Sequence, residues 1–491
     1  MPDQQTPLRL SYEPDDYLCT WNVPDGKGGS TELPGQLEVL PNRAPKGSVY
    51  GRLPLNRDEP QEGVFSFSFP QVVKAPALSG TLANGGSVIL LDAHITYWTM
   101  NQGHVTGSAA LLSKGGEFFG RRSPQMAPEH DNEIPLVSSI EFQITALDAL
   151  TGTAPIASVQ TPGIHPDNPK GLWSANLNLE ARAEWAKEGV ELSVGYNGRM
   201  RTADGFEFRL CFSPVATVTF QRGVSLRVAF DEFIEPLRRI SSIATGKPQD
   251  LTYVAVRLTD IAGQYQVYGT GITQAPFASS EKDVRNHRSA IRAKADELSL
   301  LDLVLEWRKY SAEHHPLVET YGSMLHAHDQ HPRSRFLLLV QALEGLHGYE
   351  TRNEYDQRRL SHLSKREQVI GSLSSVADRD VMQFLKKFLS KNPPTSLDAV
   401  LKSMTGALPV DIMDRIAATS LVTEAMSNPS VKTPANALRI VRNNLAHGTR
   451  GYDAFELDEV VRILELAVRA HSLRILGCPD DVVKRVFEES D

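Results

Sequence analysis

The sequence predicts an α+β protein of several domains, in which an N-terminal antiparallel β-rich, sandwich-like region is followed by a C-terminal all-α bundle. Glycine and proline support this division: residues 1–280 contain 27 Gly and 22 Pro, whereas residues 281–491 contain 8 of each. Apolar residues recur at every second position in the first region and about every 3.6 positions in the second. At 491 residues, the chain is also too long for a single core.

Alternating apolar residues predict strands in the first region. The patterns are clearest at Phe65–Phe69, Ile140–Ile144 and Phe206–Phe212, where one face is apolar and the other polar. Short apolar runs predict further strands at Val88–Leu91, Val215–Phe220, Leu226–Phe230, Tyr253–Leu258 and Tyr265–Tyr268. Gly and Pro cluster between residues 150 and 170, which predicts two β-rich parts, 1–160 and 161–280. The Phe65–Phe69 stripe is interpreted as core.

Helical periodicity predicts a connector at residues 281–330 and a bundle at 331–491. We expect a helix capped by Ser334 and ended by Gly348, and a second helix through Val381–Phe388. Ser396 is expected to open the next helix, and one further helix is expected through Ile412, Ile416 and Leu421. Thr433 followed by Pro434 predicts another helix start, and the last long helix is expected over Leu457–Leu476.

Charge and composition limit the classes of function. The net charge is −8, of which residues 1–280 contribute −7 and residues 281–491 contribute −1, so no bulk basic surface for long duplex nucleic acid is expected. One window without acidic residues, Ala425–Tyr452, contains four cations. The three cysteines are far apart, and neither a signal peptide nor a long apolar segment is recognisable. We therefore expect a cytoplasmic protein without a membrane partner.

The segment Arg442–Gly448 contains groups suited to cleaving RNA without a metal. On an ideal helix Asn443 and His447 lie about 40° apart, and Arg442 lies about 140° from His447. A histidine can transfer protons, an arginine can bind the anionic phosphorane, and an asparagine can orient a hydroxyl or phosphate. RNA supplies its own nucleophile, the ribose 2′-OH. By spacing alone, the alternative is a surface arginine and a helix-capping histidine.

The same segment resembles the RNase motif of HEPN domains, in which Arg, usually followed by a polar residue, precedes His by four to six residues. Asn443 occupies the polar position, and the motif precedes the final long helix, as in that family. The resemblance implies catalytic roles for Arg442, Asn443 and His447, and a homodimer or larger homo-oligomer in which two motifs form one composite cleft.

The wider chain resembles the ApeA group of anti-phage proteins. The residues that carry this resemblance are the helix Arg335–His347, Trp21, the turn Pro34–Leu37, and Leu78–Leu82 followed by Gly85–Gly86 and Ser87–Leu91. ApeA proteins are bacterial abortive-infection effectors. The resemblance therefore implies an RNase that stays silent until infection, an RNA substrate with tRNA among the candidates, and a phage-derived trigger.

Other residues of the bundle are weaker candidates. Glu344 and Asn444 are possible supports of the motif, with a solvent-facing glutamate as the alternative for Glu344. Possible RNA-binding residues are Lys432, Arg439, Arg450 and Tyr452, each of which also has a purely structural interpretation. His326, His328 and His331 have a spacing that a metal could use, but a polar inter-helix segment is the preferred interpretation. We predict no metal and no cofactor.

Three functions compete at this stage. The first is a metal-independent RNA endonuclease regulated by the β-rich region. The second is a non-catalytic HEPN-type module that binds a nucleotide or RNA, joined to a β-sandwich ligand sensor. The third is a β-rich domain that binds a carbohydrate or peptide, with helices that only dimerise. The presence of Arg442, Asn443 and His447 together favours the first.

Overall fold

The computed structural model describes residues 6–25, 29–52, 69–114, 117–118, 121–122, 134–161, 174–204, 207–318, 320 and 330–488. The chain forms two compact units. The first consists of Met1–Thr245 and Gln249–Val304, and the second of Gly246–Pro248 and Leu305–Asp491. The first unit is rich in antiparallel strands and the second is helical, which confirms the predicted α+β class.

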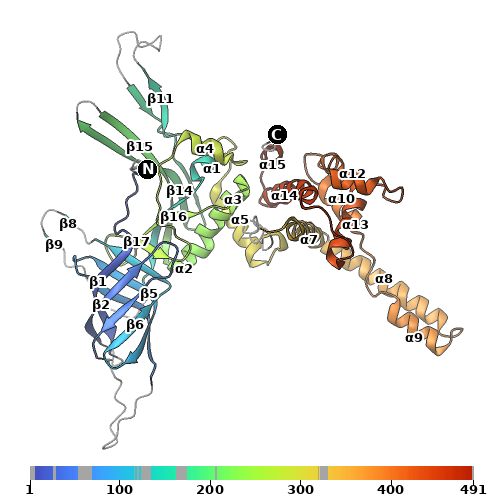
Figure 1. The fold of residues 1–491 in the computed structure, drawn as a ribbon, viewed down its shortest axis with the longest axis horizontal. Coiled ribbons are helices and arrows are strands. Elements are labelled where there is room, and N and C mark those ends of the chain that lie inside the picture. The colour runs from blue at the N-terminus through green and yellow to red at the C-terminus, as the bar shows by residue number, and fades with distance from the viewer. Residues whose placement is uncertain are drawn as a thin grey trace, which may run out of the picture. The chain divides into compact units, whose positions relative to one another are not determined.

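The first unit is built around an antiparallel sheet of 13 strands (Figure 1). The strand order is β13-β14-β15-β10-β16-β17-β7-β5-β4-β1-β2-β3-β6, and β6 also pairs with β5. The strands of this sheet are β1 (Asp15–Pro24), β2 (Ser30–Val39), β3 (Lys46–Tyr50), β4 (Gln71–Leu82), β5 (Ser87–Thr99), β6 (Gln102–Thr106), β7 (Ala109–Ser113), β10 (Val137–Ile144), β13 (Ala183–Lys187), β14 (Val190–Asp204), β15 (Glu207–Val224), β16 (Leu251–Leu258) and β17 (Gln264–Gly269). Two small hairpins join β8 (Glu117–Phe118) to β9 (Arg121–Arg122) and β11 (Ile156–Gln160) to β12 (Ser174–Leu177).

Trp21 fills the core of the sheet where three strands meet. Its side chain is fully buried, and its backbone lies opposite Leu33 of β2 and Gly80 of β4. A Cβ atom added at Gly35 would lie 2.6 Å from the indole ring, and one at Gly80 would lie 3.0 Å from it. Glycine at these positions therefore makes room for the ring. The residues that carry the ApeA resemblance in this region thus pack against one another.

Most of the predicted strands are present, but one is wrong. The run Leu226–Phe230 forms helix α2 (Leu226–Ala229), which continues into a π-helical turn, η1 (Phe230–Ile234), and α3 (Glu235–Thr245). The hydroxyl of Ser225 accepts a hydrogen bond from the backbone N–H of Val228 and so starts a helix where the apolar run alone suggested a strand. Of the predicted core stripe Phe65–Phe69, only Phe69 belongs to the described residues, and it is exposed.

The sheet continues across the division predicted at residue 160, because β10 pairs with both β15 and β16. The first unit also extends beyond residue 280. It includes α1 (Leu147–Thr151), α4 (Glu281–His287) and the start of α5 (Leu300–Ala312). The N–H of Ala290 donates to the carbonyl of Ala244, and the N–H of Ala293 donates to that of Leu150. These bonds tie the segment after α4 to the β-rich unit rather than to the helices that follow.

The second unit is a helical bundle centred on α7 and α14, which pack against each other. Its helices are α7 (Pro332–Glu350), α8 (Arg352–Leu373), α9 (Arg379–Phe388), α10 (Leu397–Gly406), α11 (Met413–Ala417), α12 (Ser420–Met426), α13 (Pro434–His447), α14 (Ala454–Ile475) and α15 (Asp480–Glu488). Buried apolar side chains of α7, among them Phe336 and Leu343, and of α14, among them Val461 and Val468, form the centre of this core.

Three details of the bundle differ from the expectations. His331, not Ser334, caps α7, because its Nδ1 accepts from the N–H of Arg333, and the helix continues through Gly348. The single helix expected through Ile412 and Leu421 is two helices, α11 and α12, since the extended backbone of Thr419 separates them. Helix α8 was not expected at all. It forms a hairpin with α9 that projects from the other helices and has no buried residue (Figure 1).

Candidate active site

Helix α13 carries the motif, and its local sequence fixes where it begins and ends. The hydroxyl of Thr433 accepts from the N–H of Asn436, and Pro434 occupies the first turn. Gly448 ends the helix with φ of 67°, a left-handed conformation that glycine adopts without strain. One face of the helix is buried, through Ala437, Leu438, Val441 and Leu445. The remaining polar side chains of the motif are thereby held on the outer face.

The guanidinium of Arg442 is oriented by two neighbours. Its Nη2 lies 3.2 Å from the Glu344 carboxylate on α7, and its Nη1 donates to Oδ1 of Asn443 at 3.4 Å. All three side chains are half-buried. Further N–H donors of the guanidinium remain for an anionic ligand, so this arrangement can present a fixed cation to a phosphate. Glu344 is the residue that the sequence suggested as a possible support of the motif.

A cavity of about 570 Å³ lies beside Arg442. Glu344 of α7, the start of α10 and the outer face of α13 line it. Asp398 of α10 lies 2.8 Å from Nε of Arg439 and accepts a hydrogen bond from Nδ2 of Asn436 at 3.0 Å. Arg439 and Arg442 therefore both line the cavity, and each has a carboxylate partner.

His447 is not among the residues that line this cavity. It is exposed in the last turn of α13, and the helix ends directly after it. Nη2 of Arg333 donates to the carbonyl of Leu445 at 2.6 Å, which brings a cation to the same helix end. In one chain, therefore, Arg442 and Asn443 line a cavity with Glu344, whereas the exposed His447 lies one helical turn beyond Asn443 and does not line it.

Asn444 and Tyr452 form a separate cluster after the motif. Nδ2 of Asn444 donates to the Tyr452 hydroxyl at 2.7 Å, and its Oδ1 accepts from the Thr449 hydroxyl at 3.1 Å. Arg450 lies over the Tyr452 ring and forms an ion pair with Glu424 at 2.9 Å. These contacts stabilise the turn after α13. Lys432 is exposed, ahead of the cap of the helix.

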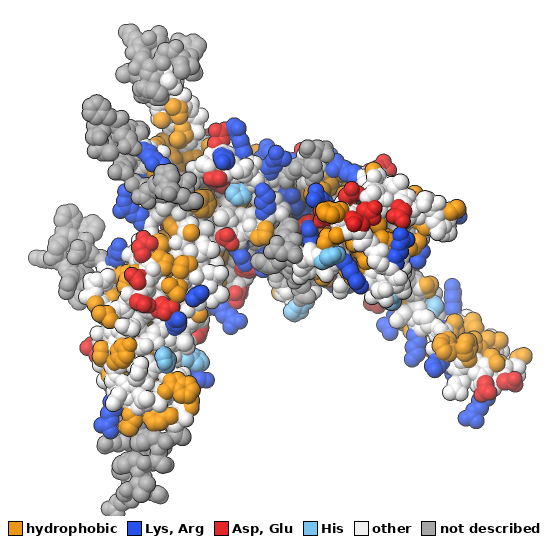
Figure 2. All heavy atoms as spheres, in the orientation of Figure 1, with side chains coloured by type: hydrophobic (Ala, Val, Ile, Leu, Met, Phe, Trp, Pro, Cys, Tyr) orange, Lys and Arg blue, Asp and Glu red, His pale blue; other side chains and the backbone are white. Residues whose placement is uncertain are grey.

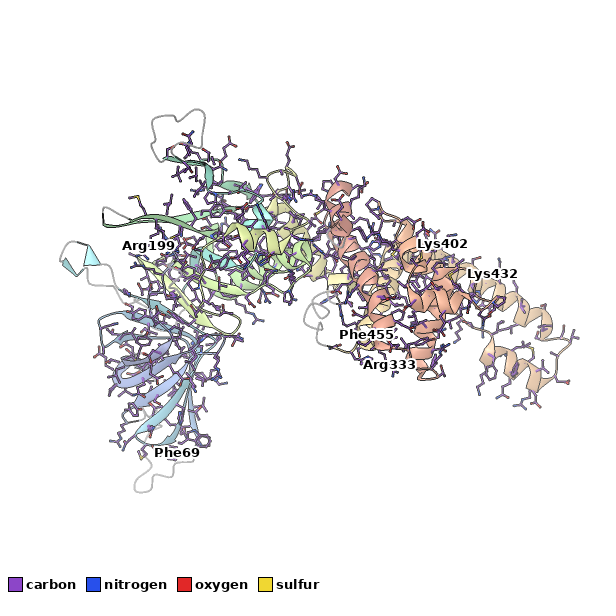
Figure 3. The ribbon with its side chains drawn as sticks, turned by 45° about the horizontal axis from the view of Figure 1, so that its top comes forward. Phe69, Arg199, Arg333, Lys402, Lys432 and Phe455 are labelled. Carbon is purple, nitrogen blue, oxygen red and sulfur yellow. The ribbon has the colours of Figure 1, made fainter. Side chains whose placement is uncertain are left out.

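Sequence reasoning missed Asp398, Arg333 and Phe455. Asp398 and Arg333 are far from the motif in sequence, so no local spacing points to them. Phe455, near the start of α14, is 84% exposed, which is unusual for phenylalanine. In Figure 3, Arg333 and Phe455 lie at one edge of the helical unit, and Lys402 and Lys432 lie at another.

The histidine cluster before α7 lies only partly in the described residues. Within the described part of the chain, no group of three or more His, Cys, Asp or Glu side chains is arranged to hold a metal ion. His326 and His328 lie outside the described residues, and His331 is the cap of α7. His315 is buried between Tyr310 and Tyr349, and this burial lowers its pKa. Among the described helices, none has both the length and the apolar character needed to cross a membrane.

Comparison with known proteins identifies the family. The family model described as ApeA N-terminal domain 1 matches residues 16–307, which is more than half of the chain. The chain belongs to the ApeA family. It is therefore a member of a family of anti-phage defence proteins. The matched residues cover most of the β-rich unit described above and end within α5, before the motif on α13. Searches of curated proteins and of solved structures found no match.

Proposed function

We propose that this ApeA-family chain is a metal-independent RNA endonuclease whose C-terminal helical unit is a HEPN domain. The observation that carries the proposal is the arrangement around Arg442. A half-buried guanidinium, oriented by Glu344 and Asn443, lines a polar cavity and shares one helix with His447. These groups suit a reaction in which charge develops on a phosphate and protons move between oxygens.

In the proposed reaction, the 2′-oxygen of a ribose attacks the adjacent phosphorus and the bond to the 5′-oxygen of the next nucleotide breaks. One group accepts the proton of the 2′-OH, and another delivers a proton to the departing oxygen. The products are a 2′,3′-cyclic phosphate, which water can open to a 3′-phosphate, and a free 5′-hydroxyl. Arg442 would stabilise the charge on the phosphorane, Asn443 would orient it, and His447 would transfer a proton.

The separation of His447 from the cavity supports a shared site. Within one chain, His447 does not line the cavity that Arg442 and Asn443 line. A twofold dimer pairs the same surface of both chains and can bring His447 of the second chain to Arg442 of the first. We therefore propose a homodimer with composite active sites, kept silent by the β-rich unit until a phage-derived trigger releases it.

The test compares RNA ends in cells before and after phage infection, so that any trigger is present. Cells carrying the wild-type protein should gain RNA fragments with 5′-hydroxyl ends after infection, and cells carrying Arg442→Ala or His447→Ala should not. Fragments with 5′-phosphate ends would contradict the mechanism. Such ends form when water attacks the phosphorus and the bond to the 3′-oxygen breaks, instead of the bond to the 5′-oxygen. Purified active protein should keep cleaving RNA in EDTA. Binding of RNA without cleavage in every condition would favour the non-catalytic module instead.

A further inference from the structure

The cavity beside Arg442 has its own ligand chemistry. Its polar lining comes from three helices and includes Arg439, Asp398 and Ser396 in addition to Arg442, Asn443 and Glu344. We infer that this cavity is a nucleobase subsite, which receives the base of a nucleotide next to the scissile phosphate. The inference rests on the proposed RNase function for its role in cleavage, but not for the binding itself.

Charge balance favours a neutral ligand. The two arginines that line the cavity are matched by two carboxylates, Glu344 and Asp398, each in contact with one of the arginines. With the scissile phosphate at Arg442, a second phosphate in the cavity would have only Arg439 to bind and would meet the adjacent Asp398 carboxylate, and that repulsion would offset much of the attraction. A base carries no net charge and avoids this repulsion. The scissile phosphate would then lie at Arg442, at the side of the cavity, with the attached nucleotide inside.

The polar groups of the cavity match the edge of a base. Each of the four bases of RNA has a hydrogen-bond donor next to an acceptor on its pairing edge, and proteins read these edges in single-stranded RNA. Arg439 offers donors and Asp398 offers an acceptor, and their ion pair fixes the two groups side by side. Ser396 caps α10 by position, but its side chain makes no capping hydrogen bond, so its hydroxyl is available to a ligand.

The size of the cavity is also appropriate for a nucleobase. Its volume of about 570 Å³ lies within the range of roughly 300–1,000 Å³ that is usual for small-molecule sites. Side-chain exposures of 38% for Arg439 and 30% for Asp398 leave both side chains partly open to the cavity. Oδ1 of Asp398, which faces Arg439, is itself buried, so a ligand would approach Oδ2. Arg439 and Asp398 are therefore proposed as base-reading residues, distinct from the reacting groups.

Nucleoside binding to the full-length protein tests the inference without requiring catalysis. Guanosine, adenosine, cytidine and uridine, which contain no phosphate, are titrated into the wild type, Arg439→Ala, Asp398→Asn and the control Lys402→Ala, whose exposed cation does not line the cavity. We expect at least one nucleoside to bind the wild type and Lys402→Ala with equal affinity. The substitution Arg439→Ala should weaken the affinity for that nucleoside about tenfold or more. Asp398→Asn should change which nucleoside binds best, because an amide offers a donor as well as an acceptor.

The outcomes separate this inference from the proposed function. If no nucleoside binds the wild type, or if Arg439→Ala binds each nucleoside as the wild type does, the subsite is wrong even where RNA is cleaved. If His447→Ala abolishes cleavage but binds nucleosides normally, both proposals stand. If Arg439→Ala weakens nucleoside binding but no RNA is ever cleaved, the base subsite is supported and the proposed RNase function is wrong. If inorganic phosphate bound the wild type more tightly than any nucleoside did, and Arg439→Ala weakened that binding, the cavity would be a phosphate site and the inference would be wrong. Unfolding curves of each variant exclude loss of fold as the cause.

Discussion

The two faces of α13 differ in what their side chains contact. The inner face places Leu438, Val441 and Leu445 in the core. The outer face presents Arg439, Arg442 and Asn443, which are half-buried and polar, and the last turn presents the exposed His447. The inner face contributes stability by removing apolar area from water, whereas the outer face keeps ionised groups close to solvent. Stability and chemistry are therefore separable along this one helix, and substitutions can test the two faces independently.

The largest expected effect is on cleavage. Arg442→Ala and His447→Ala should each reduce the cleavage rate by about 100-fold or more, because each removes a group that acts on charge or protons in the transition state. The free energy of unfolding should change by only about 0.5 kcal/mol, since neither side chain belongs to the core. Cleavage kinetics and chemical denaturation measure the two quantities. Lys402→Ala is the matched control and should leave both unchanged. Full activity in either motif variant would remove that residue from the mechanism.

The inner face should show the reverse behaviour. Leu438→Ala is expected to lower the free energy of unfolding by about 2–5 kcal/mol, because Leu438 is fully buried and its truncation leaves a cavity. Cleavage by the molecules that remain folded should be close to that of the wild type. Denaturant unfolding gives the stability, and activity measured well below the midpoint gives the function. A large loss of activity in stable, folded Leu438→Ala would show that the two faces are coupled.

Stability should also depend on pH through a histidine of the core. His471 of α14 is fully buried, and this burial lowers its pKa from 6.5 to about 4, with the nearby Arg474 adding to the effect. Above about pH 6.5 the residue is neutral in both the folded and the unfolded chain. As pH falls, the unfolded chain binds the proton first, so the free energy of unfolding decreases between pH 6.5 and 4, by up to about 3 kcal/mol.

The difference between the wild type and His471→Gln isolates this contribution. Nε2 of His471 lies 3.0 Å from the carbonyl of Met404, and a glutamine amide can donate to a carbonyl without titrating in this range. Unfolding curves of His471→Gln should therefore depend less on pH between 6.5 and 4 than those of the wild type. Equal pH dependence of the two proteins would mean that His471 is not responsible.

The two faces also differ in how far the sequence could predict them. Thr433, Pro434 and Gly448 are local signals, and they correctly predicted where α13 begins and ends. The apolar spacing of Leu438, Val441 and Leu445 correctly predicted the inner face. Of the polar partners of α13, Glu344 was named from the sequence as a possible support of the motif, with a solvent-facing side chain as the alternative. Asp398, which is 38 positions from Asn436, and Arg333, which is 112 positions from Leu445, were not expected. Such contacts depend on how helices pack, which spacing along the chain does not encode.

Outside the motif, missed elements have equally specific causes. Helix α8 is largely polar and its apolar residues do not gather on one face, so periodicity did not indicate a helix, although its many Arg, Glu, Gln and Leu residues favour one. Figure 2 shows hydrophobic side chains on the hairpin that α8 forms with α9, and Phe384 and Phe388 of α9 are about 60% exposed. For the run Leu226–Phe230, the cap residue Ser225 was the signal that would have separated a helix from a strand.

Asn443→Ala should have a smaller effect than loss of Arg442 or His447. Asn443 is uncharged, and its Oδ1 accepts one hydrogen bond from the guanidinium of Arg442. One hydrogen bond contributes about 0.5–1.5 kcal/mol, so a decrease in the cleavage rate of roughly tenfold is expected. Asn443→Asp nearly keeps the size of the side chain, so comparing it with Asn443→Ala shows whether lost side-chain volume contributes to the effect. A loss as large as that of His447→Ala would assign Asn443 a direct part in proton transfer or charge stabilisation.

The smallest effect, and the one that bears most directly on the separation of His447 from the cavity, comes from mixing subunits. If the two motifs of a dimer form one composite cleft that needs Arg442 and His447 of both chains, an inactive partner should impair a wild-type chain. Equal amounts of wild-type and Arg442→Ala protein, unfolded and refolded together, should then show about half of the activity of the same wild-type protein refolded alone, because random pairing leaves half of the wild-type chains with a mutant partner. Lys402→Ala in place of Arg442→Ala is the control and should not inhibit. Mixing Arg442→Ala with His447→Ala should not restore the wild-type level, since each dimer would still lack groups of the shared sites. Wild-type activity per wild-type chain, with no activity in the mixture of the two inactive variants, would show that one chain holds a complete site. Activity regained in that mixture would instead show a site that takes Arg442 from one chain and His447 from the other.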